Sequence, residues 1–329
     1  MSEEVDSREE APGRTEGRES VGFDESRDDR PGAPEGIGNA LESDEKSDGI
    51  VRSFTPFRGM SYTLRRFYAV SHHNAEDSTM FPLFRADGSP YIIAECCNNF
   101  QNSIEIAEDM IYEAKRAGAD AVKFQHRRRI STSQLNALGA AAQRAGLNFL
   151  CTAYDEAGVD ELVELGIQVL KVGSAEATNI PFLKHVASKG LPTIVSTGCM
   201  SAADVRSIDA VFEDIPLAMM HTVSIYPTPP AQAGLFLLKN LCDGYSDHTA
   251  RLEVVAAAIA MGARIVEMHV TISRNLPGPD QQVSFEFPEL RSLVEFARAW
   301  PEMSRAKPKV PLAEERVKID QFRKPEWRR

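Results

Sequence analysis

The sequence lacks several features that would point to particular classes of protein. Five cysteines in 329 residues are too few for a fold built on disulfide bonds. No stretch approaches the ~18 consecutive apolar residues of a membrane-spanning helix. The acidic N-terminus MSEEVDSREE does not have the basic and then apolar pattern of a secretory signal. We therefore expect a cytoplasmic protein with no membrane partner.

Basic charge is scarce as well. Residues 1–50 contain 16 acidic and 6 basic side chains, and the remaining 279 residues contain 32 acidic and 31 basic ones. The larger part is therefore close to neutral and offers no basic surface to nucleic acid. Residues 1–50 also have few large apolar side chains, so burial cannot offset the entropy of ordering them, and we predict a disordered acidic tail.

A regular alternation of strand-like and helix-like segments follows the tail and an aromatic-rich stretch. Residues 51–90 are expected to form an N-terminal extension or a capping hairpin, and residues 301–329, with 9 basic and 5 acidic side chains, a basic C-terminal tail. Eight apolar runs lie between them, namely YIIAE, DAVKFQ, NFLCT, QVLKV, PTIVST, PLAMMH, LCDGYS and RIVEMHV. Eight strands that alternate with helices over ~210 residues favour an α/β fold, a (β/α)8 TIM barrel spanning residues 91–300.

Polar side chains stand where these strands end. A charged group at the end of a buried strand is costly unless it is paired or used, and the active sites of such barrels lie at the carboxyl ends of the strands. We therefore predict one site at that rim. Its candidates at this stage include Glu95, Lys123, Gln125, Thr152, Lys171, Ser174, Glu176, Ser246, His248, Glu267 and His269.

Two histidines within this set indicate a metal site. His248 and His269 follow the seventh and eighth strands, which are neighbours around a barrel, so their imidazoles can converge. Two imidazoles with the nearby carboxylates of Glu95 and Asp280 suit a divalent transition metal. The adjacent Cys96 and Cys97 do not have the spacing of zinc ligands.

Two lysines within the set indicate an anion site. Lys123 and Lys171 end the second and fourth strands, and with the hydroxyls of Thr152 and Ser174 they can receive a small, multiply charged anion such as a phosphorylated carboxylate. A lysine that forms a Schiff base is the alternative use of such a group. The run HRRR at residues 126–129 is either a solvated loop or a further contact for an anionic group.

The order of the motifs resembles a known family. AECCNNF, DAVKFQ, CTAYD, LKVGSAEATNIPFL, VSTG, HTVSIYPTP, GYSDHT, VEMHVT and LPGPDQQVS together resemble the sialic acid synthase family of PEP-dependent nonulosonic acid synthases, over roughly residues 91–290. The resemblance implies condensation of phosphoenolpyruvate (PEP) with an aldehyde sugar, N-acetylmannosamine or a similar one. The products would be a 2-keto-3-deoxy sugar acid and phosphate.

The resemblance also implies roles for individual residues. A divalent ion, of the manganese type with Mg²⁺ or Co²⁺ as alternatives, would be held by His248 and His269. The residues implied to bind PEP are Lys123, Thr152, Lys171 and Ser174, with Ser246 assisting. Those implied to face the sugar or the metal-bound water are Glu95, Gln125, Tyr226, Glu176 and Asp280. Glu95 is the first choice for proton transfer, because a carboxylate close to a metal and a ligand serves as acid or base.

The sequence departs from the family pattern in four places. The first strand reads AECCNNFQN where the family has A-E-I-G-x-N-H-x-G, so Cys97 stands for a glycine and Phe100 for a histidine. The PGPDH motif ends in Gln281. Only 26 residues separate Gln125 from Thr152, a shorter connection than the family's. The family's C-terminal antifreeze-like domain, which contributes an arginine to the partner subunit's sugar site, is expected to have no counterpart in this sequence.

These departures leave PEP and metal binding intact but predict an altered sugar acceptor. A homodimer is compatible with the resemblance, although the family's dimer depends partly on the absent domain. Two alternatives remain: a barrel without catalytic activity that acts as a binding subunit, and an aldolase that uses a Schiff-base lysine.

Overall fold

Eight parallel strands pair in chain order and close into a barrel, which confirms the predicted (β/α)8 fold. The computed structural model describes residues 83–126 and 130–322. Within them β1 pairs with both β2 and β8, so the sheet closes on itself. The strands of the barrel are β1 (Tyr91–Cys97), β2 (Ala121–His126), β3 (Asn148–Ala153), β4 (Leu170–Val172), β5 (Thr193–Ser196), β6 (Leu217–Thr222), β7 (Gly244–Asp247) and β8 (Ile265–Thr271).

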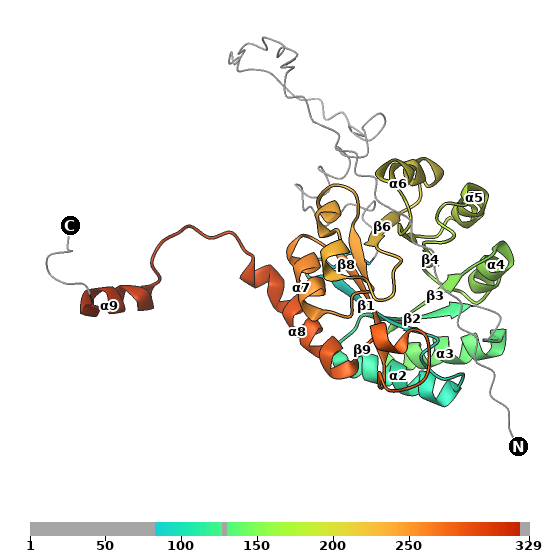
Figure 1. Cartoon of the computed structure of the whole chain (residues 1–329), viewed down its shortest axis with the longest axis horizontal. Coiled ribbons are helices and arrows are strands. Elements are labelled where there is room, and N and C mark those ends of the chain that lie inside the picture. The colour runs from blue at the N-terminus through green and yellow to red at the C-terminus, as the bar shows by residue number, and fades with distance from the viewer. Residues whose placement is uncertain (1–82, 127–129, 323–329) are drawn as a thin grey trace, which may run out of the picture. The chain divides into compact units, whose positions relative to one another are not determined.

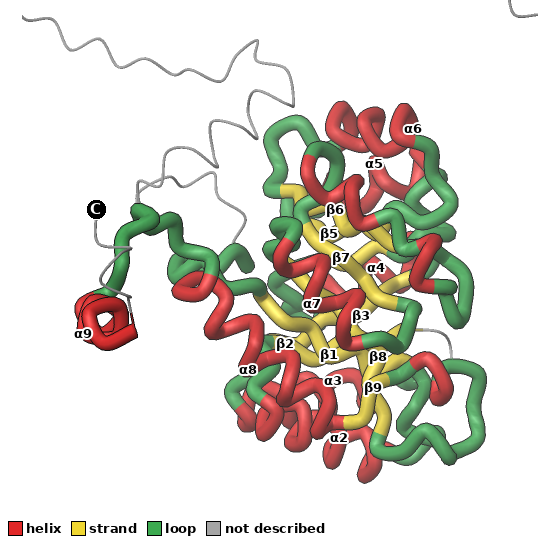
Figure 2. The backbone as a smooth tube through the Cα atoms, turned by 60° about the vertical axis from the view of Figure 1, so that its left-hand side comes forward, coloured by secondary structure: helices red, strands yellow, loops and turns green. Residues whose placement is uncertain are grey.

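Helices connect most successive strands and lie outside the barrel (Figures 1 and 2). These helices are α2 (Ile104–Ala117), α3 (Thr132–Ala145), α4 (Glu156–Glu164), α5 (Ile180–Ser188), α6 (Ala202–Ile208), α7 (Leu252–Ala260) and α8 (Phe287–Met303). Between β6 and β7 the described chain forms only the short 3-10 turns η2 (Pro230–Gln232) and η3 (Leu235–Lys239). A short strand, β9 (Phe285–Glu286), pairs with β8, and α9 (Ala313–Phe322) follows α8.

Helix α2 begins and ends at residues that are typical of helix caps. The side chain of Ser103 accepts a hydrogen bond from the Ile106 N–H at the start of α2, and Gly118, with φ 89°, ends that helix. Glycine adopts this left-handed conformation without the steric cost that a side chain would add. Between the caps, Met110 and Ile111 are buried and pack on the outer face of the barrel, so the helix is held by its apolar stripe.

Side chains alternate along each strand between the helical layer and the barrel interior. The interior layer of apolar residues comprises Tyr91, Ile93, Ala121, Leu150, Val169, Ile194, Ala218, Met220 and Ile265. Two residues further along the same strands, and hence on the same face, stand Glu95, Lys123, Thr152, Lys171, Ser196 and Glu267. The strand register therefore places a polar layer directly above an apolar floor, toward the carboxyl ends of the strands.

An ion-pair cluster lies at the opposite, amino-terminal end of the strands. Asp120 precedes β2, and its two oxygens accept hydrogen bonds from Arg85 at 2.7 Å and from Arg298 at 2.6 Å. The same carboxylate accepts the backbone N–H of Ile92 at 2.7 Å. Leu83 packs beneath the interior apolar layer, and this cluster fixes the chain that enters β1 to helix α8.

Several expected segments lie wholly or partly outside the described residues. The predicted acidic tail, most of the predicted extension over residues 51–90, Arg127–Arg129 of the HRRR run and residues 323–329 belong to this group. Residues 83–90 of the extension form turns. Helix α8 continues to Met303, beyond the predicted barrel boundary at residue 300, and α9 lies within the predicted basic tail.

Candidate active site

Two buried lysines and a glutamate form the centre of the site. Lys123 and Lys171 are 3% and 4% exposed. The carboxylate of Glu267 lies between them, 3.5 Å from Lys123 Nζ and 3.7 Å from Lys171 Nζ. The predicted lysine pair is thus brought together. Glu267 was a strand-end candidate to which no role was given. Its position between the two ammonium groups follows from the register of β8 with its neighbours β1 and β7.

The charges of this trio differ in how easily they are lost. Burial opposes the charge of Glu267, but Lys123 and Lys171 outweigh it and lower the pKa of Glu267 to about 2. Burial also opposes the charge of Lys123, whose pKa is nevertheless raised by Glu267 and Glu95. Burial dominates at Lys171 and lowers its pKa to about 8. At neutral pH the trio therefore carries one negative and two positive charges.

Glu95 is the other carboxylate that contacts Lys123. Its Oε2 lies 2.5 Å from Lys123 Nζ, and its Oε1 accepts a hydrogen bond from Gln125 at 3.1 Å. Gln125 in turn accepts one from the hydroxyl of Tyr154 at 2.7 Å. Burial first, and then the charge of Glu267, raise the pKa of Glu95. Two neighbouring carboxyl groups with pKa values moved in opposite directions are typical of a site that transfers protons.

Hydroxyl groups and a glycine surround the lysines at the ends of β4 and β5. Lys171 Nζ donates to Ser196 Oγ at 2.7 Å, and Lys123 Nζ to Thr152 Oγ1 at 3.1 Å. Ser174 Oγ accepts the backbone N–H of Gly198 at 3.1 Å. A Cβ atom at Gly198 would lie 2.2 Å from Ser224 Oγ and 2.7 Å from Ser174 Oγ, so a glycine leaves room for these hydroxyls.

The two predicted metal ligands lie side by side above this layer. The ring centroids of His248 and His269 are 5.4 Å apart, and Tyr226 lies against His248 with centroids 4.0 Å apart. His248 Nδ1 is 2.7 Å from the carbonyl oxygen of Val223. Burial, followed by the proximity of His269, lowers the pKa of His248 to about 4, so the ring is neutral and able to bind a metal.

His269 belongs to a cluster of metal-binding side chains. One ligand atom each from Cys97, His269 and Asp280 lies within 4.8 Å of the others. Cys97 Sγ donates a hydrogen bond to Asp280 Oδ2 at 2.9 Å, whereas the buried His269 Nδ1 has no hydrogen-bond partner among the residues that the structure describes. Sequence reasoning set the cysteines aside because of their spacing. The signal that could have identified Cys97 was its place at the end of β1, which is the neighbour of strand β8 in a closed barrel.

The remaining predicted residues also reach this rim. Ser246 Oγ donates to Glu267 Oε1 at 3.2 Å. Glu176 is half-buried. A Cβ atom added at Gly173, just after β4, would lie 2.8 Å from Glu176 Oε2 and 3.8 Å from Thr152, so Glu176 lies close to Thr152. The structure thus gathers all twelve predicted site residues at the carboxyl ends of the strands.

Two residues that depart from the family pattern have structural contacts. Phe100 is 2% exposed and packs edge-on against Phe124, with ring centroids 5.9 Å apart, in the layer between barrel and helices. Gln281 is buried and bonded to Thr271 and to the backbone oxygen of Asn99. Neither side chain therefore contributes a polar group to the site.

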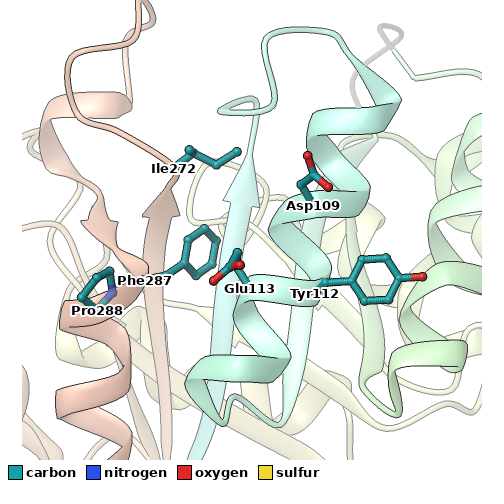
Figure 3. A pocket seen from close by; sticks show the side chains of 6 residues that line it. All are labelled: Asp109, Tyr112, Glu113, Ile272, Phe287 and Pro288. Atoms are coloured by element: carbon teal, nitrogen blue, oxygen red, sulfur yellow. The ribbon is translucent and has the colours of Figure 1, made fainter.

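A pocket on the outer wall is separate from these residues. It lies between α2 and the start of α8 (Figure 3) and is lined by Asp109, Tyr112, Glu113, Ile272, Phe287 and Pro288. None of the predicted site residues lines it, so we assign it no role. Among the described helices, none has the length and apolar character needed to cross a membrane.

Comparison with known proteins gives consistent matches. The model of the NeuB family matches residues 126–307. N,N'-diacetyllegionaminic acid synthase of Legionella pneumophila is 34% identical over 254 residues, which are 63% of this chain and 71% of that protein. N-acetylneuraminate-9-phosphate synthase of Drosophila melanogaster is 33% identical over 246 residues, covering 62% and 66%.

A solved structure gives the same result. The N-acetylneuraminic acid (sialic acid) synthetase from Leptospira borgpetersenii, in complex with citrate, is 30% identical and superimposes with a TM-score of 0.64. The match covers 71% of this chain and 92% of that one.

Proposed function

Because this chain belongs to the NeuB family, and thus to a family that includes sialic and legionaminic acid synthases, we propose that it is an enzyme that condenses PEP with an aldehyde sugar. The products are a 2-keto-3-deoxy sugar acid and phosphate. The observation that carries the proposal is the buried pair of Lys123 and Lys171 with Glu267 between them. The trio has two positive charges and one negative charge, and such an excess of buried positive charge favours the binding of an anion.

The lysines and hydroxyls bind PEP in this proposal. The ammonium groups face the carboxylate and phosphate of PEP, and the hydroxyls of Thr152 and Ser174 fix its orientation. Ser174 and the backbone N–H of Gly198 already form a hydrogen bond and so mark where a phosphate oxygen is received. Glu267 holds both ammonium groups in place before PEP arrives.

A divalent metal fits the histidine pair. Within residues 83–126 and 130–322, the buried His269 Nδ1 has no hydrogen-bond partner. His248 is neutral at physiological pH because its pKa is lowered to about 4. We assign the ion to His248 and His269, with Asp280 beside them. When bound, such an ion supplies Lewis-acid polarisation of the sugar aldehyde.

Glu95 transfers protons in this proposal. C3 of PEP forms the new carbon–carbon bond with the aldehyde carbon, and the aldehyde oxygen takes up a proton. Water then adds to C2 and loses a proton, which leaves a hydroxyl and the phosphate on the same carbon. The C2–oxygen bond to phosphate breaks as this hydroxyl becomes the keto group, and the hydroxyl proton passes to the departing phosphate. The raised pKa of Glu95 lets it donate the first proton and accept the second, and its contacts with Lys123 and Gln125 hold the carboxyl group in position.

The sugar lies on the side of Gln125, Tyr226, Glu176 and Asp280. These side chains offer an amide, a phenol and two carboxylates, which suit the hydroxyl and N-acyl groups of an N-acetylmannosamine-like acceptor. Tyr226 is 50% exposed and lies against His248, so it borders the opening through which a sugar reaches the histidines.

A Schiff-base aldolase is the second candidate, and one observation favours it. Burial lowers the pKa of Lys171 to about 8, which increases the fraction of neutral, nucleophilic amine. Borohydride reduction in the presence of a keto acid distinguishes the two functions. A covalent adduct on Lys171 supports the aldolase, and its absence, with phosphate release from PEP, supports the synthase.

The test of the synthase is phosphate release from PEP. Purified protein is incubated with PEP, N-acetylmannosamine or another aldose, and Mn²⁺, Mg²⁺ or Co²⁺. We expect release that depends on the sugar, and a loss of ~100-fold or more in kcat in Glu95→Gln, the size typical of a lost acid–base group. Absence of release with every aldose and every ion would contradict the proposal.

A further inference from the structure

Cys97 occupies a backbone position that disfavours a side chain. Its φ is 47°, in the left-handed region, which costs a non-glycine residue about 1 kcal/mol or more. The register of β1 against β2 shifts between Glu95 and Cys97, so a bulge produces this conformation at the end of the strand. The family pattern has glycine here, which would relieve the cost. A thiol at this position is therefore retained at the expense of backbone stability.

The thiol points to the metal ligands and not into the apolar layers. Cys97 is 2% exposed, and its Sγ lies 2.9 Å from Asp280 Oδ2. One nitrogen of His269 completes a set of three ligand atoms within 4.8 Å of one another. Two ligands ~2.0–2.3 Å from one tetrahedral zinc ion are ~3.3–3.8 Å apart, so small side-chain movements bring all three to an ion.

We propose that Cys97 is a thiolate ligand of the metal, so that the site is a cysteine, histidine and aspartate site joined to His248. The inference rests on the proposed function only in that both use the same ion. On binding, the ion takes the place of the thiol proton now directed at Asp280, and that proton is released to solvent. No electrons are transferred.

The ligand set determines which metal is preferred. Thiolate is a soft ligand that selects zinc and other late divalent ions, whereas manganese and magnesium prefer oxygen ligands. A histidine pair with carboxylates alone would accept manganese readily. The addition of Cys97 shifts the preference toward Zn²⁺, Co²⁺ or Fe²⁺, which is a property of this chain and not of the histidine pair.

Cobalt spectroscopy tests the thiolate directly and without any turnover. The metal-free protein is titrated with Co²⁺ while the thiolate-to-cobalt charge-transfer band in the near ultraviolet and the ligand-field bands in the visible region are recorded. We expect the charge-transfer band in the wild type and in Cys199→Ser, which removes the exposed thiol. The band should be absent in Cys97→Gly and Cys97→Ser.

Affinity gives a second measure. Cys97→Gly should lower the affinity for Zn²⁺ by ~100-fold, at least the effect of removing a ligand's supporting partner, and that for Mn²⁺ much less. The glycine variant relieves the left-handed φ, so its thermal unfolding temperature should equal or exceed that of the wild type, which shows that any lost band is not caused by unfolding.

Two outcomes would overturn the inference. Visible bands without a charge-transfer band in the wild type would show cobalt held by imidazoles and carboxylates alone, which removes the thiolate and leaves the proposed function in place. A protein that binds no cobalt would remove both the thiolate and the metal. Phosphate release from PEP by the wild type with Mn²⁺ tests the proposed function separately.

Discussion

Lys171 shows how one residue's surroundings translate into a pH dependence. It is buried beside Ser196 and Glu267, and burial lowers its pKa to about 8. A base with a lowered pKa loses its proton as the pH rises through that value, whereas the unfolded chain keeps it up to about 10.5. The attraction for an anion is therefore present below pH 8 and is lost above it.

The first prediction follows from this sign. The kcat/KM for PEP should fall toward a ~10-fold loss per pH unit above pH 8, because the profile of kcat/KM reports the free enzyme. Lys171→Arg keeps its charge at all these pH values, so its profile should be lower but flat in the same range. A wild-type profile that stays level up to pH 9.5 would contradict the assignment of Lys171 to PEP.

Individual residues also show what could be inferred before the structure. Lys123, Thr152 and Lys171 were expected to share one rim, because the carboxyl ends of parallel strands meet at one end of a barrel and the period of two fixes the face on which each side chain lies. Glu267 lies on the same face, but nothing in its own strand indicates that both lysines pair with it. That pairing depends on the register between β1 and β8.

Cys97 escaped prediction for a different reason. Its contact with Asp280 joins residues 183 positions apart and depends on a bulge that no local pattern announces. Spacing rules for cysteines apply to ligands on one turn or hairpin. They carry no information about a site assembled from strand ends.

At the scale of elements, the loop between β5 and α6 borders the proposed anion site. Gly198 is the second residue of this loop, and its backbone N–H donates to Ser174. Its φ is not in the left-handed region, so the backbone tolerates alanine. The steric cost of a side chain would fall entirely on the hydroxyls of Ser174 and Ser224.

Gly198→Ala should therefore raise the KM for PEP by ~10-fold to ~100-fold, since displaced hydroxyls lose hydrogen bonds to a charged group worth ~1.5–3 kcal/mol each. Gly139→Ala on α3 is the matched control. Its Cβ would lie 3.6 Å from Phe149, an ordinary contact, and alanine favours a helix. Steady-state kinetics and thermal melts check both variants, and an unchanged KM in Gly198→Ala would contradict the placement of PEP.

The elements themselves were largely predictable. All eight strands of the barrel were found from apolar, β-branched runs, with ends displaced by up to three residues, as where LCDGYS from Leu241 becomes β7 at Gly244–Asp247. The short β9 was missed, because its two residues are too few to show a period. It forms only because β8 offers Val270 and Thr271 as partners.

At the scale of the whole molecule, stability and chemistry are placed at opposite ends of the barrel. The Asp120 cluster lies before β2, whereas the lysines and histidines lie at the other ends of the strands. This division is typical of the fold. It implies that the two properties can be changed separately.

Asp120→Ala tests the separation. Removal of the carboxylate leaves Arg85, Arg298 and the Ile92 N–H without their partner, so we expect a loss of about 2–4 kcal/mol in the free energy of unfolding. The kcat and KM of the folded fraction should stay within about twofold of wild type. Asp87→Ala, which removes a half-exposed partner of Arg85, should cost less than about 1 kcal/mol. Denaturant titration measures the free energy of unfolding, and steady-state kinetics on the same samples measure kcat and KM. An equal loss of unfolding free energy in both variants would contradict the role of Asp120.

The buried amides of Asn99 and Gln281 have a consequence for how the barrel mouth behaves. Asn99 Nδ2 donates to Val270 O and to Ser284 Oγ, and Gln281 joins Thr271 to Asn99 O. These hydrogen bonds connect the segment that carries Asp280 to the one that carries Cys97, and movement of either segment away from the other would break them. This side of the barrel mouth is therefore held rigid. Its side chains need little reorganisation before a ligand binds.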